Sequence, residues 1–179
     1  MHLRALKEKD AEGMLEWMQD PAILKGFGEA MSHKTREDVL SFISAAGTDA
    51  VHGESVHYAI ANEKDEYLGT ISLKNIDLLS KTAEYAISLR SCAHGKGIGT
   101  QATREILRIA FEKLHLQRVY LNVFSDNAGA IRLYEKSGFV YEGALRRHLF
   151  IRGEYKSFLL YGMLDDEYFE KYGMRRNEK

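Results

Sequence analysis

Several residue types that mark particular protein classes are scarce in this chain. Its 179 residues include one cysteine and one proline, and the formal net charge is −1. The single cysteine, Cys92, excludes an intramolecular disulfide and a cysteine-rich zinc site. No run approaches the roughly 18 apolar residues that span a bilayer, and the near-neutral charge gives no electrostatic case for nucleic acid or anionic membrane. We expect a cytoplasmic protein that binds neither.

The residues that are present are typical of one globular domain. Apolar residues make up 45% of the chain and charged residues 28%, so a sizeable core is available. The sequence has no internal repeat, low-complexity tract or linker. We expect a single domain over residues 1–179, with a core of about 2–165 and a C-terminal helical tail over 165–179.

The spacing of apolar residues predicts an α+β, or mixed α/β, fold. One helix is expected over 10–20, closed by Pro21, and a second after Thr35, which Asp38 helps to cap. The later elements are expected to be strands at Val56–Asn62, Tyr67–Ile76, Thr82–Leu89 and Arg118–Phe124, a long helix before the last of these, a short helix over about Asn127–Ser137, and a final two-stranded hairpin.

Three glycines, Gly95, Gly97 and Gly99, alternate between the strand that ends at Leu89 and the long helix. The first turn of a helix has unpaired N–H groups and the positive end of the helix dipole. Glycines let the backbone bring those groups close to a phosphate without interference from a Cβ. Neighbouring Lys96 adds a positive charge. We expect the loop to hold a pyrophosphate.

Two common phosphate-binding loops do not match these glycines. A Walker A loop needs lysine where Ile98 follows Gly97, and the dinucleotide fingerprint is not completed after Gly99 and Thr100. The loop of coenzyme A-dependent N-acetyltransferases, (Gln/Arg)-x-x-G-x-(Gly/Ala), is similar to the segment that begins at His94. His94 replaces the usual Gln or Arg, but a backbone cradle does not depend on that side chain.

A second motif lies in the segment NAGAIRLYEKSGFVYEG, residues 127–143. It resembles the N-x-x-A-x-x-L-Y-x-K-x-G-F signature of the GCN5-related N-acetyltransferase (GNAT) family, through Asn127, Ala130, Leu133, Tyr134, Lys136, Gly138 and Phe139. The two motifs follow in the family's order and at its usual separation. The segment EGALRRHLFIRGEYKSFLLYGML is similar to the branch that contains spermidine, ribosomal-protein N-terminal and nucleotide-sugar acetyltransferases.

This resemblance implies a twisted mixed central sheet flanked by about four helices. Its fourth and fifth strands, here Thr82–Leu89 and Arg118–Phe124, would splay apart to admit the pantetheine arm. Acetyl-CoA would be the cosubstrate, with no metal, and the acetyl group would pass directly to a primary amine in a ternary complex. The acceptor would be a polyamine, an amino-sugar nucleotide or a protein N-terminus, and the protein a homodimer or larger homo-oligomer. The alternative is a non-catalytic coenzyme A-binding or regulatory domain on the same fold.

The resemblance also assigns roles to residues. Tyr134 would be the acid that protonates the leaving thiolate, although a core aromatic would look the same in sequence. Glu84 would relay a proton from the amine through water, or else form a structural ion pair with a cation. His57 and His148 are weaker candidates for the base. The residues expected to bind the coenzyme are Ile87, Ser88 and Leu89 through their backbone, His94, Gly95, Lys96, Gly97, Ile98, Gly99 and Thr100 around the pyrophosphate, and Asn127, Ala130 and Lys136 along the arm and phosphates.

The acceptor is less well specified. Four acidic residues near the first two helices would attract a cationic amine, or are simply solvated: Glu29, Glu37, Asp38 and Glu54. Ser72 stands where polyamine acetyltransferases are expected to carry an acid, and Lys74 adds positive charge. An amino-sugar nucleotide would suit Lys74, Arg146 and Arg147, because a diphosphate attracts cations.

Overall fold

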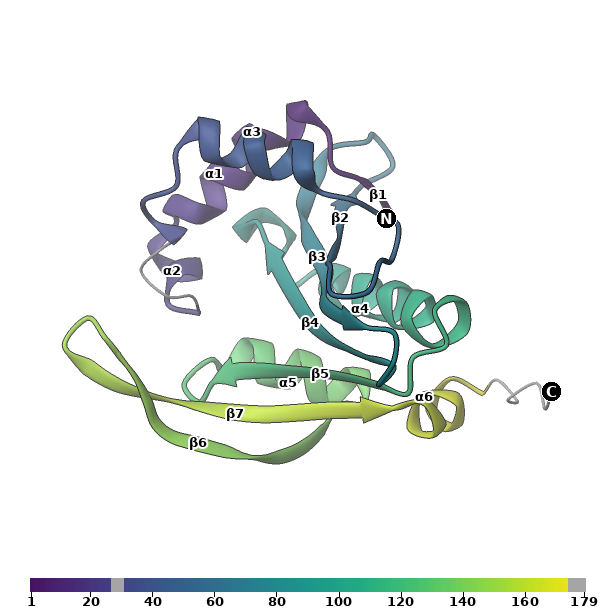
Figure 1. Ribbon diagram of the computed structural model, residues 1–179. Coiled ribbons are helices and arrows are strands. Elements are labelled where there is room, and N and C mark those ends of the chain that lie inside the picture. Colours follow the sequence, from purple (N-terminus) through teal and green to yellow (C-terminus); the bar gives the residue numbers. More distant parts are fainter. Residues whose placement is uncertain (27–30, 174–179) are drawn as a thin grey trace.

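The computed structural model describes residues 1–26 and 31–173 (Figure 1). Its strands form one mixed sheet in the order β1-β2-β3-β4-β5-β7-β6. The strands are β1 (His2–Ala5), β2 (Val56–Ala61), β3 (Tyr67–Asp77), β4 (Thr82–Leu89), β5 (Arg118–Phe124), β6 (Val140–Ile151) and β7 (Glu154–Leu164). The helices are α1 (Ala11–Gln19), α2 (Pro21–Leu24), α3 (Arg36–Ala45), α4 (Ile98–Arg108, continued by a π-helical turn, Ile109–Lys113), α5 (Ala128–Ser137) and α6 (Asp165–Tyr172).

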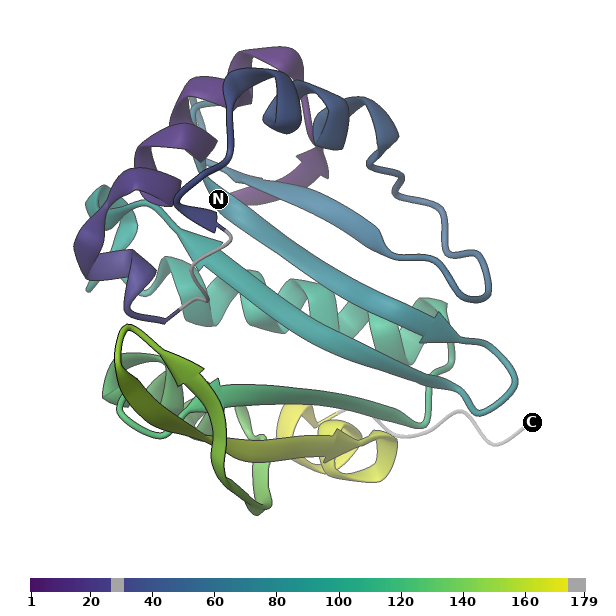
Figure 2. The same cartoon turned by 60° about the vertical axis from the view of Figure 1, so that its left-hand side comes forward.

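Helices cover both faces of the sheet and enclose two separate cores (Figures 1 and 2). Successive residues of a strand point to opposite faces, and neighbours on β2 show this. Ile60 belongs to the larger core, which includes Leu107 of α4 and Tyr134 of α5. Ala59 belongs to the smaller core, under α1 and α3, with Trp17. In residues 1–26 and 31–173, no helix combines the length and apolar character needed to cross a membrane.

The sheet opens between β4 and β5. These parallel strands pair only from Thr82 opposite Arg118 to Glu84 opposite Tyr120. Beyond Glu84 they diverge, and Figure 1 shows the wedge-shaped separation. On its other side β4 stays paired with β3 as far as Leu89. The splayed strands expected from the sequence are confirmed.

Most predicted elements are confirmed, and two of them, β4 and β5, to the residue. The predicted cap of α3 is a reciprocal capping box, in which the Asp38 N–H donates to Thr35 Oγ1 over 3.2 Å and the Thr35 N–H donates to Asp38 Oδ2 over 2.8 Å.

Two expectations need correction. The short edge strand β1 was not predicted, because four residues carry too little alternation to read. Pro21 does more than close α1, since it is the first residue of α2, where its missing N–H is tolerated. The described residues hold six α-helices, of which α2 was not predicted, while α6 lies in the tail that was expected to be helical.

Gly69 on β3 leaves no room for a side chain beside β4. A Cβ there would lie 2.2 Å from the Ser88 carbonyl oxygen, whereas a Cβ at Gly47 would meet nothing within 4 Å. We expect Gly69→Ala to lower the free energy of unfolding by about 3 kcal/mol, because the backbone of β4 would have to shift. Gly47→Ala is the matched control, with little expected change. Urea unfolding measures both, and equal values would contradict the expectation.

Candidate functional site

The glycine loop ends at a helix whose first turn has no side-chain cap. Gly95 and Gly97 have φ values of +71° and +74°, and Gly97 is the N-cap of α4. The first intrahelical bond runs from the Gln101 N–H to the Gly97 carbonyl over 3.1 Å. A Cβ at Gly95 or Gly97 would meet nothing within 4 Å, so the space beside the loop is open. An uncapped helix N-terminus with open space beside its glycines fits a pyrophosphate.

Gly99 serves a different purpose from the other two glycines. It is buried, and a Cβ there would lie 3.3 Å from both Leu133 of α5 and Leu89 of β4. Its carbonyl accepts a 2.7 Å hydrogen bond from Thr103 Oγ1. Gly99 therefore lets α4 pack closely, rather than giving a ligand access. The side chains of His94 and Lys96 are exposed on the loop, whereas Ile98 and Thr100 are half-buried.

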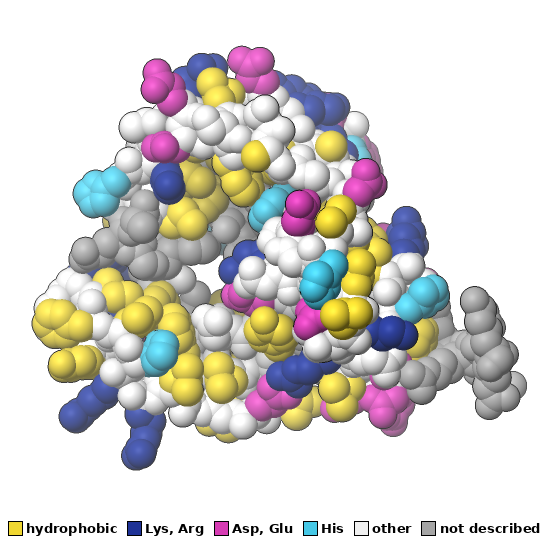
Figure 3. Space-filling model, viewed as in Figure 1, with side chains coloured by type: hydrophobic (Ala, Val, Ile, Leu, Met, Phe, Trp, Pro, Cys, Tyr) yellow, Lys and Arg dark blue, Asp and Glu magenta, His cyan; other side chains and the backbone are white. Residues whose placement is uncertain are grey.

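The free edge of β4 connects this loop with the closed end of the opening. Ile87, Ser88 and Leu89 pair with β3 on one side, and on the other they lie beyond the last β4–β5 pair. Their main-chain groups on that side can pair with an extended ligand as an added strand would. In Figure 3 this face of the molecule is hollowed between the α1–α3 layer and the β5–β7 layer.

Tyr134 lies beside the closed end of the opening, on the α5 side of the sheet. Its ring centroid is 5.7 Å from that of Tyr85, the first β4 residue after the last pair, and 6.0 Å from that of Phe139. The residue is 7% exposed, and burial raises the pKa of its phenol to about 12. Tyr134 is thus packed in the core, which is the structural role that the sequence left open. It is also a phenol that keeps its proton at neutral pH.

Glu84 lies on the opposite face of β4 from Tyr85. Its carboxylate accepts hydrogen bonds from Lys74 Nζ over 2.8 Å and from Asn75 Nδ2 over 3.1 Å. Its side chain is 18% exposed. The pairing with a cation, which the sequence left open, is therefore present. The carboxylate and the Tyr134 phenol flank the closed end of the opening from two sides of the sheet.

A histidine–serine pair lies on the Glu84 face, one strand further out. His57 Nδ1 is 2.7 Å from Ser72 Oγ, and the Phe42 ring contacts the imidazole edge-on, with centroids 4.8 Å apart. Burial, with a smaller contribution from the Lys74 charge, lowers the pKa of His57 below its usual 6.5. That His57 adjoins Ser72 and Lys74 could not be predicted from the sequence, because it depends on the register of β2 on β3.

The α5 residues are partly committed to the helix itself. Asn127 Oδ1 caps α5 by accepting from the Ala130 N–H over 3.2 Å, and its amide N–H₂ is the group that can donate to a ligand. Lys136 is exposed near the other end of α5, about 13 Å along the helix axis from Asn127. His148 lies on β6, which β5 and β7 separate from Glu84. Cys92 is exposed.

The acceptor-side candidates are dispersed. Glu29 lies outside the described residues, while Glu37, Asp38 and Glu54 are exposed. Arg146 and Arg147 are exposed on β6 and line a surface hollow of about 760 Å³. Among the described residues no group of three or more His, Cys, Asp or Glu side chains is arranged to hold a metal ion.

The comparisons with known proteins agree with this geometry. A family model described as "Acetyltransferase (GNAT) domain" matches residues 1–140. The chain belongs to the GNAT acetyltransferase family. GNAT relatives include the spermidine N(1)-acetyltransferase of Escherichia coli (strain K12), 32% identical over 107 residues, which are 60% of this chain and 58% of the relative. The probable N-acetyltransferase YjcK of Bacillus subtilis (strain 168) is 36% identical over 118 residues, which are 64% and 65%.

A solved GNAT structure has the same fold. The crystal structure of spermidine N-acetyltransferase from Vibrio cholerae in complex with CoA and spermine superposes with a TM-score of 0.83. The match covers 94% of this chain and 97% of that one, at 24% sequence identity. The match to the curated Escherichia coli relative spans less than two thirds of that protein's length.

If the glycine loop and the N-terminus of α4 form a cradle for the pyrophosphate, Gly97→Ala should weaken the binding of coenzyme A. A side chain at φ +74° costs about 1–2 kcal/mol, and the added methyl group would also occupy the open space beside the α4 N–H groups. We expect coenzyme A affinity to fall at least about tenfold. Gly53→Ala is the control, because Gly53 has φ +82° and equally open surroundings away from the loop. Calorimetric titration with coenzyme A should separate the two, and an equal affinity in both variants would argue against the cradle.

Proposed function

We propose that this chain is an acetyl-CoA-dependent N-acetyltransferase, which transfers an acetyl group directly to a primary amine in a ternary complex. The observation that carries the proposal is the opening between β4 and β5. The uncapped helix N-terminus lies at its wide end, and the Tyr134 phenol lies beside its closed end. One extended ligand with a pyrophosphate near one end and a thioester at the other would fit both. Acetyl-CoA supplies the activated acetyl group when bound.

In this proposal the protein's residues orient the reactants and move two protons. The backbone of Ile87, Ser88 and Leu89 holds the pantetheine arm, and the Asn127 amide donates to it. As the amine nitrogen bonds to the carbonyl carbon and the carbon–sulfur bond breaks, Tyr134 gives its phenolic proton to the sulfur. General acid catalysis of this kind contributes roughly 10²–10⁴-fold. Ala130 shapes the contact surface, and Lys136 contributes charge from the end of α5.

The proton that leaves the amine goes to Glu84 through water. A free alkylamine with a pKa of about 10.4 is neutral in only roughly one molecule in a thousand at pH 7.4. Glu84 lies at the last β4–β5 pair and holds its carboxylate on the face opposite Tyr134. Its hydrogen bonds to Lys74 and Asn75 fix its orientation. The acid and the base therefore approach the reacting atoms from different sides.

For the acceptor we propose a small amine or a protein N-terminus. The spermidine acetyltransferases among the relatives support a polyamine, and the ribosomal-protein-serine acetyltransferase of Escherichia coli (strain K12), 30% identical over 104 residues, supports a protein. Ser72 in place of an acid weakens the case for a polyamine and leaves an amino-sugar nucleotide as the other small-amine candidate, although Lys74 is already paired with Glu84.

The proposal includes the expected cytoplasmic location and self-association. The edge strand β6 and its partner β7 expose Tyr141, Phe150 and Tyr155. A long strand edge with exposed aromatic side chains is a surface that another copy can cover. Light scattering in solution measures the assembly directly.

Replacement of the phenol tests the reaction. We expect Tyr134→Phe to lower kcat about 10²–10³-fold while coenzyme A affinity stays nearly unchanged, because only the hydroxyl is removed. A free-thiol assay with acetyl-CoA, across polyamines, amino acids, amino-sugar nucleotides and N-terminal peptides, measures the rate. Tyr141→Phe, which removes an exposed phenol, is the control. Coenzyme binding without turnover on any acceptor would favour the non-catalytic alternative.

The raised pKa of Tyr134 predicts the pH dependence. A folded-state pKa of about 12 leaves the acid form intact well above neutral pH, while alkaline conditions deprotonate the amine. With an alkylamine acceptor, kcat/KM should therefore rise from pH 6 to about pH 10 with no falling limb from the enzyme. A falling limb near pH 8 that disappears in Tyr134→Phe would contradict this assignment.

A further inference from the structure

The segment that leads from β4 into the glycine loop, which we call the coenzyme loop from here on, is attached to α1 and α2 on the Glu84 face of the sheet. Arg90 and Ser91 are the first two residues after β4 and lead into the glycine loop. Arg90 Nη2 donates to Glu16 Oε2 of α1, and Ser91 Oγ donates to Asp20 Oδ2, at the junction of α1 and α2. These contacts join segments more than 70 residues apart in the chain. No part of the proposed reaction uses them.

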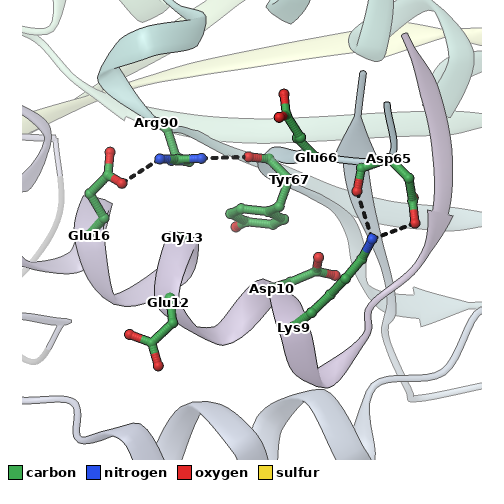
Figure 4. Close-up of a pocket in the computed structure, with 9 residues that line it drawn as sticks. All are labelled: Lys9, Asp10, Glu12, Gly13, Glu16, Asp65, Glu66, Tyr67 and Arg90. Atoms are coloured by element: carbon green, nitrogen blue, oxygen red, sulfur yellow. Dashed lines mark hydrogen bonds and ion pairs between the residues drawn. The ribbon is translucent and has the colours of Figure 1, made fainter. Parts of the chain in front are cut away.

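Arg90 makes three hydrogen-bonded contacts, and Figure 4 shows the two made by its guanidinium group. Its backbone N–H donates to the Leu68 carbonyl over 2.9 Å, and its Nη1 donates to the Tyr67 carbonyl over 3.0 Å. The third contact is the ion pair with Glu16, which reaches it from α1. Its Nε is buried with no hydrogen-bond partner among the described residues. A buried donor without a partner lowers stability. The arginine therefore contributes by holding β3 and α1 in a fixed position relative to the loop.

The surface to which Arg90 attaches is itself fixed. Trp17 Nε1 donates to the Tyr67 hydroxyl over 3.1 Å, and that hydroxyl lies 2.7 Å from Thr70 Oγ1. Helix α1 packs so closely that a Cβ at Gly13 would lie 2.7 Å from the Tyr67 ring. Burial raises the pKa of Tyr67 to about 12, so this network stays neutral. Helix α1 is therefore a rigid support on the start of β3.

Asp20 has two tasks at once. Its Oδ1 accepts from the Ala22 N–H over 2.8 Å and caps α2, while Oδ2 accepts from Ser91. The Ser91 hydrogen bond, followed by those from the α2 backbone and a weaker contribution from His94 in the loop, lowers the pKa of Asp20. The carboxylate stays charged at neutral pH and fixes the loop to the start of α2.

We infer that Glu16 and Asp20 are positioning residues for the coenzyme loop, which act through Arg90 and Ser91 and couple coenzyme binding to the placement of α1 and α2. The inference rests on the proposed function. A loop fixed at its start loses less conformational freedom when a pyrophosphate binds, so these contacts raise affinity without touching the ligand. In return, the bound coenzyme holds α1 and α2 in place on the face that carries Glu84.

The test compares two double variants. Glu16→Ala with Ser91→Ala removes both attachments and leaves the α2 cap intact. The matched control is Glu12→Ala with Ser80→Ala. Glu12 is on α1, like Glu16, and pairs with Arg36 of α3, while Ser80 hydrogen-bonds Asp77 in the β3–β4 turn. The control therefore loses equivalent contacts away from the loop. All four side chains are on exposed residues, and thermal melting confirms folding.

We expect the test variant to bind coenzyme A about tenfold more weakly than the control, with KM for acetyl-CoA raised in parallel and kcat changed less than about twofold. Hydrogen exchange supplies the second readout. Coenzyme A should slow exchange in residues 11–24 of the unaltered chain and of the control, but not of the test variant. Glu16→Gln, which keeps an acceptor for Arg90, should restore part of the affinity.

Three results would overturn the inference. Equal coenzyme A affinity in the test and control variants would show that the attachments do not position the loop. Tighter binding in Glu16→Ala would show that Glu16 instead holds the Arg90 charge away from phosphate. If the unaltered chain and the control also fail to bind coenzyme A, the proposed function falls as well, which distinguishes that failure from the first two.

Discussion

The loss of pairing between β4 and β5 after Glu84 is the constraint on which the rest of the site depends. A sheet normally satisfies the main-chain groups of an interior strand on both sides. Here β4 continues for five residues beyond its last β5 partner while β3 still holds its other edge. Both motif segments open onto the gap this creates. The open edge of β4, the N-terminus of α4 and the aromatic cluster around Tyr85 form one site because all three line this gap.

Local sequence sufficed wherever one segment determines its own conformation. The residues of β4 and β5, the capping box at Thr35 and the helix-ending Gly138 are set by alternation, by short-range hydrogen bonds and by a positive φ of +97°. The position of the glycine loop before α4 was predictable for the same reason. The distinction between Gly97, in the left-handed region, and the buried Gly99 was not, because it depends on where Leu133 packs.

Features that join distant segments were not predictable from the residues alone. The partner of Glu84 follows from the β3–β4 register, which places Lys74 opposite it. The pair of His57 with Ser72 needs the β2–β3 register, and the attachment of Arg90 to Glu16 needs the docking of α1. A sequence shows that such charges exist, but their partners depend on strand pairing and helix packing, to which many residues contribute weakly.

The separation of the two cores also bears on how such a protein can change over generations. The core under α1 and α3 meets the sheet through Ala59 and Tyr67, apart from the larger core that supports α4 and α5. Substitutions in the first layer can therefore accumulate with little effect on the packing of α4 and α5. Glu16 and Asp20 connect this layer to the loop before α4, so we expect substitutions at these two positions to be rarer than at their neighbours.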